Sequence, residues 1–535
     1  MTDVARAPDV ARAPDAAGAA RLSPPASFNF VADVLAPRTR STPERVAVIG
    51  VDPSGVTERW TYARVVESTG RLAGALIEAG IVKGDRILVF MPRTPLWLIA
   101  MTACQHIGAI PVPCVTQISA SEVAYRAKQS GARGVISSAE LAGRFASMEE
   151  TTPLRIARGT VPGWLDLQTI IDTPRTIPPT AEMPAETPAL MYFTSGSSGL
   201  PKAVVHAARG VFVRCWQPWV QLGTNSDDVI WTTSDTGWTR AASCLLFGAW
   251  MHGATSLIVE GNLSATEKVE MLARHGVTLY GAVATELRQI IAGATPQPLP
   301  KLRCTISAGE AMTAELWHHW TAFSGKPLVV GFGQTETATS TLTDPTREGV
   351  NGMIGVPLEG NDIAVLADGR RTAPGVHGEI AFAGSNPGLM LGYWKENALV
   401  PAFARDGWHM TGDSGYVDEH GNLFFVGRSD DIISSSGYRI GPTEVENALM
   451  RHPSVQECAV TSSPDPARGE IVKAYIVLRP DRQGSGQLVK DLQDLVKREI
   501  APYKYPRQIE FVSDLPRTPS GKISRRALRE GRSGA

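Results

Sequence analysis

A nine-residue stretch, TSGSSGLPK, runs from Thr194 to Lys202 and combines glycines, hydroxyl side chains and a lysine. Glycines allow tight turns that bring backbone N–H groups close to an anion. Besides Lys202, the hydroxyl and glycine positions are Thr194, Ser195, Gly196, Ser197, Ser198 and Gly199. The stretch predicts a phosphate-binding loop, although it is not the Walker pattern G-x-x-x-x-G-K-[ST]. A flexible surface loop is the alternative, because short motifs also occur by chance.

Further short motifs of small, polar and charged residues follow in order along the chain. They are 234–238 (SDTGW), 309–311 (GEA), 331–337 (GFGQTET), 411–413 (TGD), 427–428 (GR), 434–439 (SSSGYR) and 519–522 (PSGK). Several of them come directly after apolar runs that predict strands. Ligands of α/β proteins bind at the carboxyl ends of strands. The motifs are therefore expected to converge on one binding site.

The elements that must position these motifs are strands alternating with helices. Apolar runs predict strands at 87–91, 110–113, 134–137, 189–193, 229–231, 255–259, 304–308 and 328–330, with a helix at 97–104. Such alternation predicts parallel sheets in α/β layers. Short strands with frequent glycines between 355 and 425 indicate a small β-barrel. The fold class is therefore α/β, with two α/β subdomains and a small barrel in a large N-terminal domain.

A smaller C-terminal α+β module is expected after the charged segment 427–431. Its predicted helices are 442–451 and 487–499, and its predicted strands are 458–462 and 472–478. We place a hinge at Asp430. The expected boundaries are therefore a disordered tail at 1–27, an N-terminal domain at 28–429 and a C-terminal domain at 430–529. The tail is rich in Ala, Pro, Asp and Arg and repeats DVARAP, which is too polar to pack.

Composition excludes several functional classes. The 535 residues are too many for one core, and the net charge of −1 gives no field to attract nucleic acid or an anionic membrane. The 6 cysteines form no C-x-x-C pair, so neither zinc nor a disulfide framework is indicated, and a reducing cytoplasm is expected. Neither a membrane span nor a signal peptide is predicted. The single histidines His206 and His252 and the pair His318/His319 lack ligand spacing and are interpreted as structural or surface residues.

The motif set resembles the AMP-forming acyl-CoA synthetases, the superfamily that includes adenylation domains and luciferases. The resemblance runs from about Phe28 to Arg529 and is closest to the medium-chain acyl-CoA synthetases, notably at 432–446, 463–469 and 501–507. It implies activation of a carboxylic acid by ATP to an acyl-adenylate, followed by transfer to coenzyme A. The implied partners are therefore a small-molecule acid, ATP, Mg²⁺ and CoA, with a homodimer possible.

The resemblance also implies roles in the adenylation step. Residues 194–202 hold the β- and γ-phosphates, Thr335 contacts the α-phosphate, and Glu336 ligates Mg²⁺, a hard ion that prefers carboxylate oxygens. Asp413 accepts the ribose hydroxyls, and Arg428 reaches the ribose or the α-phosphate. The remaining nucleotide residues implied are Gly309, Glu310, Ala311, Gly331, Phe332, Gly333 and Gln334, of which the turn 309–311, Gly331 and Phe332 resemble the adenine slot. For Glu336 and Asp413, the alternatives are a surface carboxylate and a turn-forming residue.

The C-terminal module is expected to serve both steps by rotating between them. Lys522 resembles the catalytic lysine that bridges the carboxylate and the α-phosphate, although nearby Arg525, Arg526 and Arg529 suggest a solvated basic tail instead. After rotation, a second face would bind CoA. The residues implied there are Ser436, Gly437, Tyr438, Arg439, Arg468 and Lys497. Lys497 is equally consistent with a solvated surface lysine.

The acyl pocket is expected to be lined by Trp238, Thr239, Arg240, Gly333 and the loop 281–285. Acetyl-CoA synthetases have a tryptophan at the position of Gly333, so a deeper pocket is expected, suited to medium-chain, branched or aromatic acids. At the position of Arg240, the medium-chain acyl-CoA synthetases that this chain resembles have apolar residues. At the position of Ala284, they usually have proline. Either Arg240 points away from the pocket, or it pairs with a polar group on the acid, which would then carry a carboxylate, keto or hydroxyl group.

Two other functions remain open at this stage. The first is an enzyme that loads the adenylated acid onto a carrier protein; the CoA-facing residues disfavour it, and we expect no carrier domain, since the sequence ends at Ala535. The second is a non-catalytic nucleotide-binding scaffold. The presence of both Glu336 and Lys522 disfavours that function.

Overall fold

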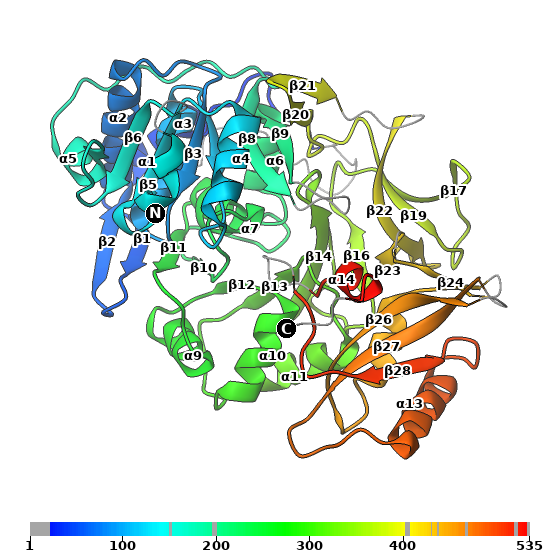
Figure 1. Cartoon of the computed structure of the whole chain (residues 1–535). Coiled ribbons are helices and arrows are strands. Elements are labelled where there is room, and N and C mark those ends of the chain that lie inside the picture. The colour runs from blue at the N-terminus through cyan, green and yellow to red at the C-terminus, as the bar shows by residue number, and fades with distance from the viewer. Residues whose placement is uncertain are drawn as a thin grey trace, which may run out of the picture.

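The computed structural model describes residues 22–148, 152–194, 201–401, 407–429, 431–435, 438–465, 469–517 and 523–531 (Figure 1). A first parallel sheet has the order β4-β3-β5-β6-β7. Its strands are β3 (Arg86–Phe90), β4 (Ile110–Pro113), β5 (Gly134–Ser138), β6 (Leu154–Arg158) and β7 (Leu165–Asp166). Its helices are α2 (Tyr62–Glu78), α3 (Pro95–His106), α4 (Ala120–Ser130) and α5 (Leu167–Asp172). Every residue of α3 is buried, which explains its apolar sequence.

The second sheet is a continuous path of 14 strands, and its parallel half is made of alternating strands and helices, as predicted. The parallel strands are β1 (Val46–Val51), β11 (Thr255–Val259), β10 (Val229–Thr232), β12 (Leu279–Ala282), β13 (Cys304–Ala308) and β14 (Leu328–Gln334). Helices α9 (Ala265–Arg274), α10 (Ala284–Gly293) and α11 (Ala314–Ser324) follow β11, β12 and β13. The edge strand β2 (Thr57–Thr61) pairs antiparallel with β1.

The short strands assigned to a small barrel extend this same sheet in antiparallel pairs. They run from β14 through β15 (Ala338–Leu342), β16 (Met353–Pro357), β23 (Leu423–Arg428), β22 (Trp408–Val417), β19 (Gly378–Ala383) and β17 (Ile363–Ala367) to β18 (Arg370–Arg371). The carboxyl end of β14 lies beside β22, because Gln334 Nε2 donates to the Thr411 carbonyl oxygen and to Asp413 Oδ2.

The strand before the predicted phosphate loop differs in context from the expectation. β8 (Pro188–Thr194) pairs antiparallel with β9 (Lys202–Ala207), and Thr194 is the register partner of Lys202. The loop therefore joins two strands of a hairpin and does not lead from a parallel strand into a helix. β20 (Gly392–Lys395) and β21 (Ala398–Pro401) complete this four-stranded sheet, which α6 (Ala208–Trp216) follows.

The C-terminal part has its own sheet and core. Its strands are β24 (Ile433–Ser435), β25 (Tyr438–Ile440), β26 (Val455–Asp465), β27 (Gly469–Leu478) and β28 (Gln508–Phe511), and its helices are α12 (Pro442–Leu449), α13 (Gly486–Glu499) and α14 (Arg525–Arg529). Figure 1 shows this orange and red part beside the antiparallel strands of the large sheet. A Cβ added to Gly441 of the C-terminal part would lie 2.5 Å from Cγ1 of Val426 on β23. The two parts are therefore in close contact.

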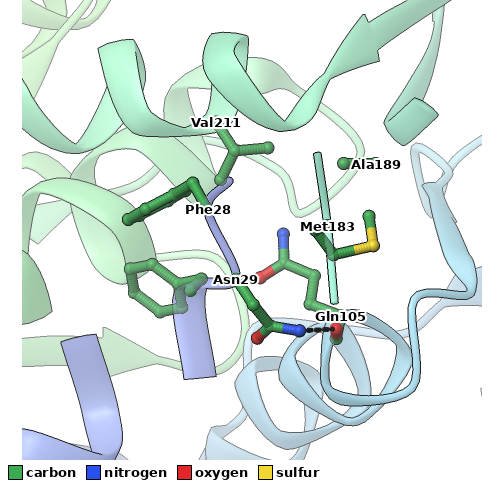
Figure 2. A pocket seen from close by; sticks show the side chains of 7 residues that line it. Phe28, Asn29, Gln105, Met183, Ala189 and Val211 are labelled. Atoms are coloured by element: carbon green, nitrogen blue, oxygen red, sulfur yellow. Dashed lines mark hydrogen bonds between the residues drawn. The ribbon is translucent and has the colours of Figure 1, made fainter. Parts of the chain in front are cut away.

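The chain enters the large core at its N-terminal end, where Asn29 donates to the carbonyl oxygens of Gln105 and Ala181 (Figure 2). The side-chain amide of Gln105 lines a cavity of roughly 10 Å³, room for about one water molecule, and has no protein partner. Leu22 packs against the same core, and Ser27 bridges to Pro184. Residues 22–27 thus do not fit the predicted disordered tail, whereas residues 1–21 lie outside the described residues.

No helix in the described ranges is long and apolar enough to cross a membrane. The 6 cysteines all lie within the described ranges, where each is buried and unpaired.

Candidate active site

Asp413 and Arg428 face each other on neighbouring strands. They are register partners of β22 and β23, and Arg428 Nη1 lies 3.0 Å from Asp413 Oδ1. Gln334, at the end of β14, donates from Nε2 to the second oxygen, Asp413 Oδ2, at 2.7 Å. Asp413 is only 5% exposed, so an unpaired carboxylate here would be costly. Three residues that the sequence predicts to bind nucleotide thus form one hydrogen-bonded group.

The tight turn after Gln334 is braced by buried groups behind it. The Gln334 N–H is bonded to Thr337 Oγ1 at 2.9 Å, and the Thr335 carbonyl oxygen lies 2.8 Å from His206 Nε2. Arg214 Nη2 lies 3.3 Å from the same carbonyl oxygen and 3.0 Å from His206 Nε2. Burial and the neighbouring Arg214 cation hold the pKa of His206 well below its ordinary value, so its ring is neutral. His206 thus has a structural role, as expected, and that role is to hold the turn at Thr335 in this site.

Glu336 lies between an aromatic hydroxyl and a lysine. Tyr393 Oη donates to Glu336 Oε1 at 3.2 Å, and Lys202 Nζ lies 5.3 Å from the centroid of the Tyr393 ring. Burial raises the pKa of Glu336, while its own backbone N–H, Tyr393 and the charges of Lys202 and Arg428 lower it. No described cation forms an ion pair with it, and a carboxylate oxygen is a ligand that a hard metal ion prefers. The described residues contain no group of three or more His, Cys, Asp or Glu side chains that could hold a metal, so Glu336 would need substrate oxygens as further ligands.

Arg240 and the predicted adenine turn meet at the end of β13. Arg240, on the short helix α7 (Thr239–Ala242), donates from Nη2 to the carbonyl oxygen of Ala308. A Cβ on Gly309 would lie 3.2 Å from that nitrogen, and Gly309 has a φ of +85°. Glu310 Oε2 accepts from the Thr285 N–H at 2.8 Å, which ties the turn to the start of α10. The loop 281–285 and the turn 309–311 therefore lie side by side.

Phe332, which is also predicted to belong to the adenine slot, packs against two other phenylalanines. Its ring is 6.3 Å from the Phe382 ring and 6.5 Å from the Phe425 ring, centroid to centroid. The side chain is only partly buried, which leaves part of its surface available to a ligand. A flat ligand stacking there is consistent with this geometry.

The SDTGW motif is fixed to the first α/β layer by its aspartate. Asp235 Oδ2 accepts from Thr116 Oγ1 at 2.5 Å, and a Cβ on Gly237 would lie 2.0 Å from the Val115 N atom. This close approach explains the glycine. Trp238 is partly buried at the start of α7, directly before Thr239 and Arg240.

Gly333 is closely packed against the neighbouring strand. A Cβ there would lie 1.7 Å from the Ala338 carbonyl oxygen, in the bulged pairing of β14 and β15. This structure therefore accommodates only glycine at this position. The expected role of Gly333 in the acyl pocket stays a prediction.

The C-terminal predictions are only partly covered. The predicted residues that lie outside the described ranges are Ser195 to Gly199 of the phosphate loop and, in the C-terminal part, Asp430, Ser436, Gly437, Arg468 and Lys522. Only the backbone of Tyr438 and Arg439 is described, on β25. Lys497 Nζ lies 2.8 Å from Asp494 Oδ1 and 4.5 Å from the Tyr505 ring centroid. These contacts hold Lys497 on its own domain, and its predicted CoA contact stays a prediction.

Of the arginines near Lys522 that suggested a solvated basic tail, Arg525 and Arg529 are not part of one, whereas Arg526 is exposed and pairs with Glu530. Arg525 binds both oxygens of Glu446 at 2.7 and 2.8 Å, and Arg529 Nη1 lies 2.6 Å from Asp431 Oδ1. Helix α14, which follows the Lys522 segment, is thereby fixed both to α12 and to the residue after the predicted hinge.

Sequence reasoning missed Tyr393, Arg214 and the site role of His206. Each lies on an element that reaches the site only by folding: β20, α6 and β9. The register of β20 against β9 places Tyr393 opposite Val204, close to Lys202. A signal was present in the VVH sequence that ends β9 directly after the phosphate loop, since a buried strand rarely contains an unpartnered histidine.

Comparison with known proteins gives a consistent result along the chain. Residues 35–394 match the family model described as AMP-binding enzyme, and residues 444–522 match that described as AMP-binding enzyme C-terminal domain. Rattus norvegicus acyl-coenzyme A synthetase ACSM4, mitochondrial, is 33% identical, with 95% of this chain and 91% of the relative covered. Homo sapiens acyl-coenzyme A synthetase ACSM5, mitochondrial, is 34% identical, with 94% and 90% covered.

Two solved structures extend the comparison. Brucella canis acyl-CoA synthetase matches with a TM-score of 0.72 and 30% identity, covering 95% of both chains. The anthranilate CoA ligase AuaEII in complex with anthranoyl-AMP matches with a TM-score of 0.85 and 26% identity, covering 95% of this chain and 98% of that one.

Proposed function

The chain belongs to the AMP-binding enzyme family, and we propose that it is an ATP-dependent carboxylic acid:CoA ligase. A carboxylate is a poor acyl donor because its leaving group would be oxide. In the proposed first step, a carboxylate oxygen bonds to the α-phosphorus of ATP, the bond to the β-phosphate bridging oxygen breaks, and pyrophosphate leaves. In the second step, the CoA thiolate bonds to the acyl carbon, and AMP leaves with that oxygen.

The observation that carries this proposal is the group formed by Asp413, Arg428 and Gln334 beside the Thr335–Glu336 turn. A buried carboxylate can accept two ribose hydroxyls, and Arg428 adds positive charge for a phosphate. The ends of β8 and β9 supply Thr194 and Lys202 for the outer phosphates. This chemistry requires positioned cations and N–H donors rather than a protein nucleophile.

Mg²⁺ fits Glu336, a partly buried carboxylate that has no cationic partner among the described residues. Mg²⁺ commonly binds through one or two carboxylates plus substrate phosphates. When bound, it would neutralise charge on the leaving pyrophosphate. Glu336 would hold it, and Tyr393 would orient the carboxylate through its hydrogen bond.

The C-terminal residues complete the proposal. Lys522 would bridge the carboxylate and the α-phosphate in the first step. The face carrying Ser436, Gly437, Tyr438 and Arg439, together with Arg468 and Lys497, would bind CoA in the second. Rotation about Asp430 would exchange the two, with domains at 28–429 and 430–529. The ion pairs of Arg525 and Arg529 support movement of the 431–529 segment as one body.

The test is pyrophosphate release from ATP and Mg²⁺ with a panel of carboxylic acids, with and without CoA. We expect release to require an acid and sustained turnover to require CoA, with AMP as the second product. Glu336→Gln should lower kcat by at least about a hundredfold, because it removes charge that supports the metal. Glu315→Gln on α11 is the control, since Glu315 is exposed. ADP formation, or release without any acid, would contradict the proposal.

A further inference from the structure

The guanidinium of Arg240 lies at the carboxyl end of the parallel strand β13, and its helix packs beside β12. Its Nη2 donates to the carbonyl oxygen of Ala308, the last residue of β13. Cys244, one helical turn further along, has its Sγ 3.1 Å from where a Cβ on Gly281 of β12 would lie. In α/β sheets this edge is where ligands bind. Arg240 therefore points toward the substrate edge of the sheet and not to the outer surface.

Most of the donors of Arg240 have no partner. A guanidinium has five N–H groups in a fixed fork. Within the described residues, Arg240 makes the single hydrogen bond to Ala308 and no ion pair. Its Nε and Nη1 are not completely enclosed by protein atoms, although burial lowers the pKa of the guanidinium. Donors in this position are suited to an acceptor on a bound ligand.

The carboxylates around Arg240 are already engaged. Glu310 accepts from the Thr285 N–H at 2.8 Å. Glu286, which is 7% exposed, lies 3.0 Å from Lys268 Nζ and accepts from Thr233 Oγ1 at 2.5 Å. Both still attract the Arg240 cation from beyond ion-pair distance. Among the described residues, the charged groups near Arg240 thus include Lys268 and the carboxylates Glu286 and Glu310, and Glu286 also attracts the Arg93 cation.

This charge balance distinguishes between two kinds of ligand acceptor. A second carboxylate on the substrate would place a further negative charge near Glu286 and Glu310 in a poorly solvated region, and its desolvation is costly even with Arg240 as its partner. A neutral oxygen would satisfy the free donors without disturbing the balance. A purely apolar tail would leave those donors desolvated and unpaired, which is also costly.

We propose that Arg240 is a specificity-determining residue that donates to a neutral oxygen, from a keto, hydroxyl or ether group, on the tail of the carboxylic acid. The proposal rests on the acid:CoA ligase function and names its substrate class. It selects against both plain alkanoic acids and dicarboxylic acids. The bond to Ala308 keeps the guanidinium at the strand ends, with its remaining donors directed to the acid.

The experiment compares matched acids by their kcat/KM for pyrophosphate release in the presence of CoA. In the aliphatic series, each plain acid from butanoate to octanoate is compared with its keto and hydroxy derivatives at each carbon beyond C2, and with the dicarboxylate of equal length. In the aromatic series, benzoate is compared with its hydroxy, methoxy and carboxy derivatives. At least one neutral-oxygen acid should exceed its plain partner by at least about tenfold, since sites built around a polar contact reject analogues that lack it.

Variants then assign the preference to Arg240. Arg240→Leu should lower kcat/KM for the preferred acid by about a hundredfold and leave or raise that for its plain partner. Arg240→Lys should keep part of the preference, and Arg240→Gln gives a second uncharged variant if the leucine variant does not fold. Arg274→Leu, which removes an exposed arginine from α9, is the control and should leave the ratio unchanged.

The outcomes separate the inference from the function on which it rests. The inference would be overturned, while the ligase function stands, if plain acids were preferred and the ratio of kcat/KM between the paired acids were the same in wild type and Arg240→Leu. A preferred dicarboxylate would overturn the neutral-oxygen assignment. ATP turnover to AMP and pyrophosphate with none of these acids would overturn the proposed function itself.

Discussion

Nε2 of His206 lies 2.8 Å from the carbonyl oxygen of Thr335, the residue before Glu336. Arg214 Nη2 lies within 3.3 Å of the same oxygen, and Arg214 is only 2% exposed. Burial lowers the pKa of Arg214 to about 10, so it is charged at neutral pH. Among the described residues it has no carboxylate partner. A buried unpaired cation is costly for stability, which suggests that it is retained for the site.

Replacing Arg214 with methionine should separate stability from activity. We expect Arg214→Met to keep or raise the urea midpoint, because it removes a buried charge. We also expect kcat to fall by about tenfold or more with little change in the KM for the acid, because the Thr335–Glu336 turn loses its brace.

Arg214→Lys should recover part of kcat, since it restores a cation that can donate. A purely structural role predicts the opposite pattern: lower stability with unchanged kcat in the protein that remains folded. That pattern would contradict the proposed positioning role of Arg214.

Asp413 offers a test of nucleotide binding. Asp413→Ala should raise the KM for ATP by at least about tenfold, because a carboxylate hydrogen bond to a ligand contributes about 1.5–3 kcal/mol. Asp362→Ala is the control, since Asp362 pairs with Arg371 at 2.6 Å at an exposed position. Equal KM values for the two variants would argue against ribose binding at Asp413. Initial rates at varied ATP and saturating acid provide the measurement.

Ala338 ends the site turn in a left-handed conformation with a φ of +63°. That conformation costs about 1 kcal/mol for a residue with a Cβ, and glycine avoids the cost. Ala338→Gly should therefore keep or raise the free energy of unfolding by up to about 1 kcal/mol. Ala292→Gly, at an exposed position of α10, should lower it by about 1 kcal/mol. Both variants are measured by urea unfolding. Equal decreases in the free energy of unfolding for Ala338→Gly and Ala292→Gly would contradict backbone strain at Ala338.

Buried neutral histidines predict a loss of stability in acid. Burial lowers the pKa of His252 to about 4, against about 6.5 in the unfolded chain, and its Nε2 lies 3.2 Å from the Cys215 carbonyl oxygen. The unfolded state therefore binds the proton more tightly. The stability that this difference supports is complete above pH 6.5 and is lost as the pH falls toward 4.

The measurement is urea unfolding between pH 7.5 and 4.5 for the wild type and His252→Gln. The difference in free energy of unfolding between the two proteins should shrink by about 2 kcal/mol over this range. A constant difference at all pH values would show that His252 titrates normally in the folded protein.

The sequence predicts local features of this protein well and tertiary ones poorly. The apolar runs at 87–91 and 255–259 became β3 and β11 because burial on both faces of a parallel strand leaves a continuous apolar signature. The Asp413–Arg428 pair arises from strand register, which no single motif contains. Arg525 looked like part of a basic tail because its partner Glu446 is 79 residues away. The close approach of the β15 backbone to Gly333 likewise comes from strand pairing, which the sequence does not show.

Oxygen transfer from acid to AMP tests the central claim most directly. The preferred acid is labelled with ¹⁸O in its carboxylate and incubated with ATP, Mg²⁺ and CoA, and the AMP is analysed by mass spectrometry. Attack of the carboxylate on the α-phosphorus predicts one ¹⁸O in each AMP and none in pyrophosphate. Unlabelled AMP, label in phosphate, or ADP as the product would contradict an acyl-adenylate intermediate and with it the proposed function.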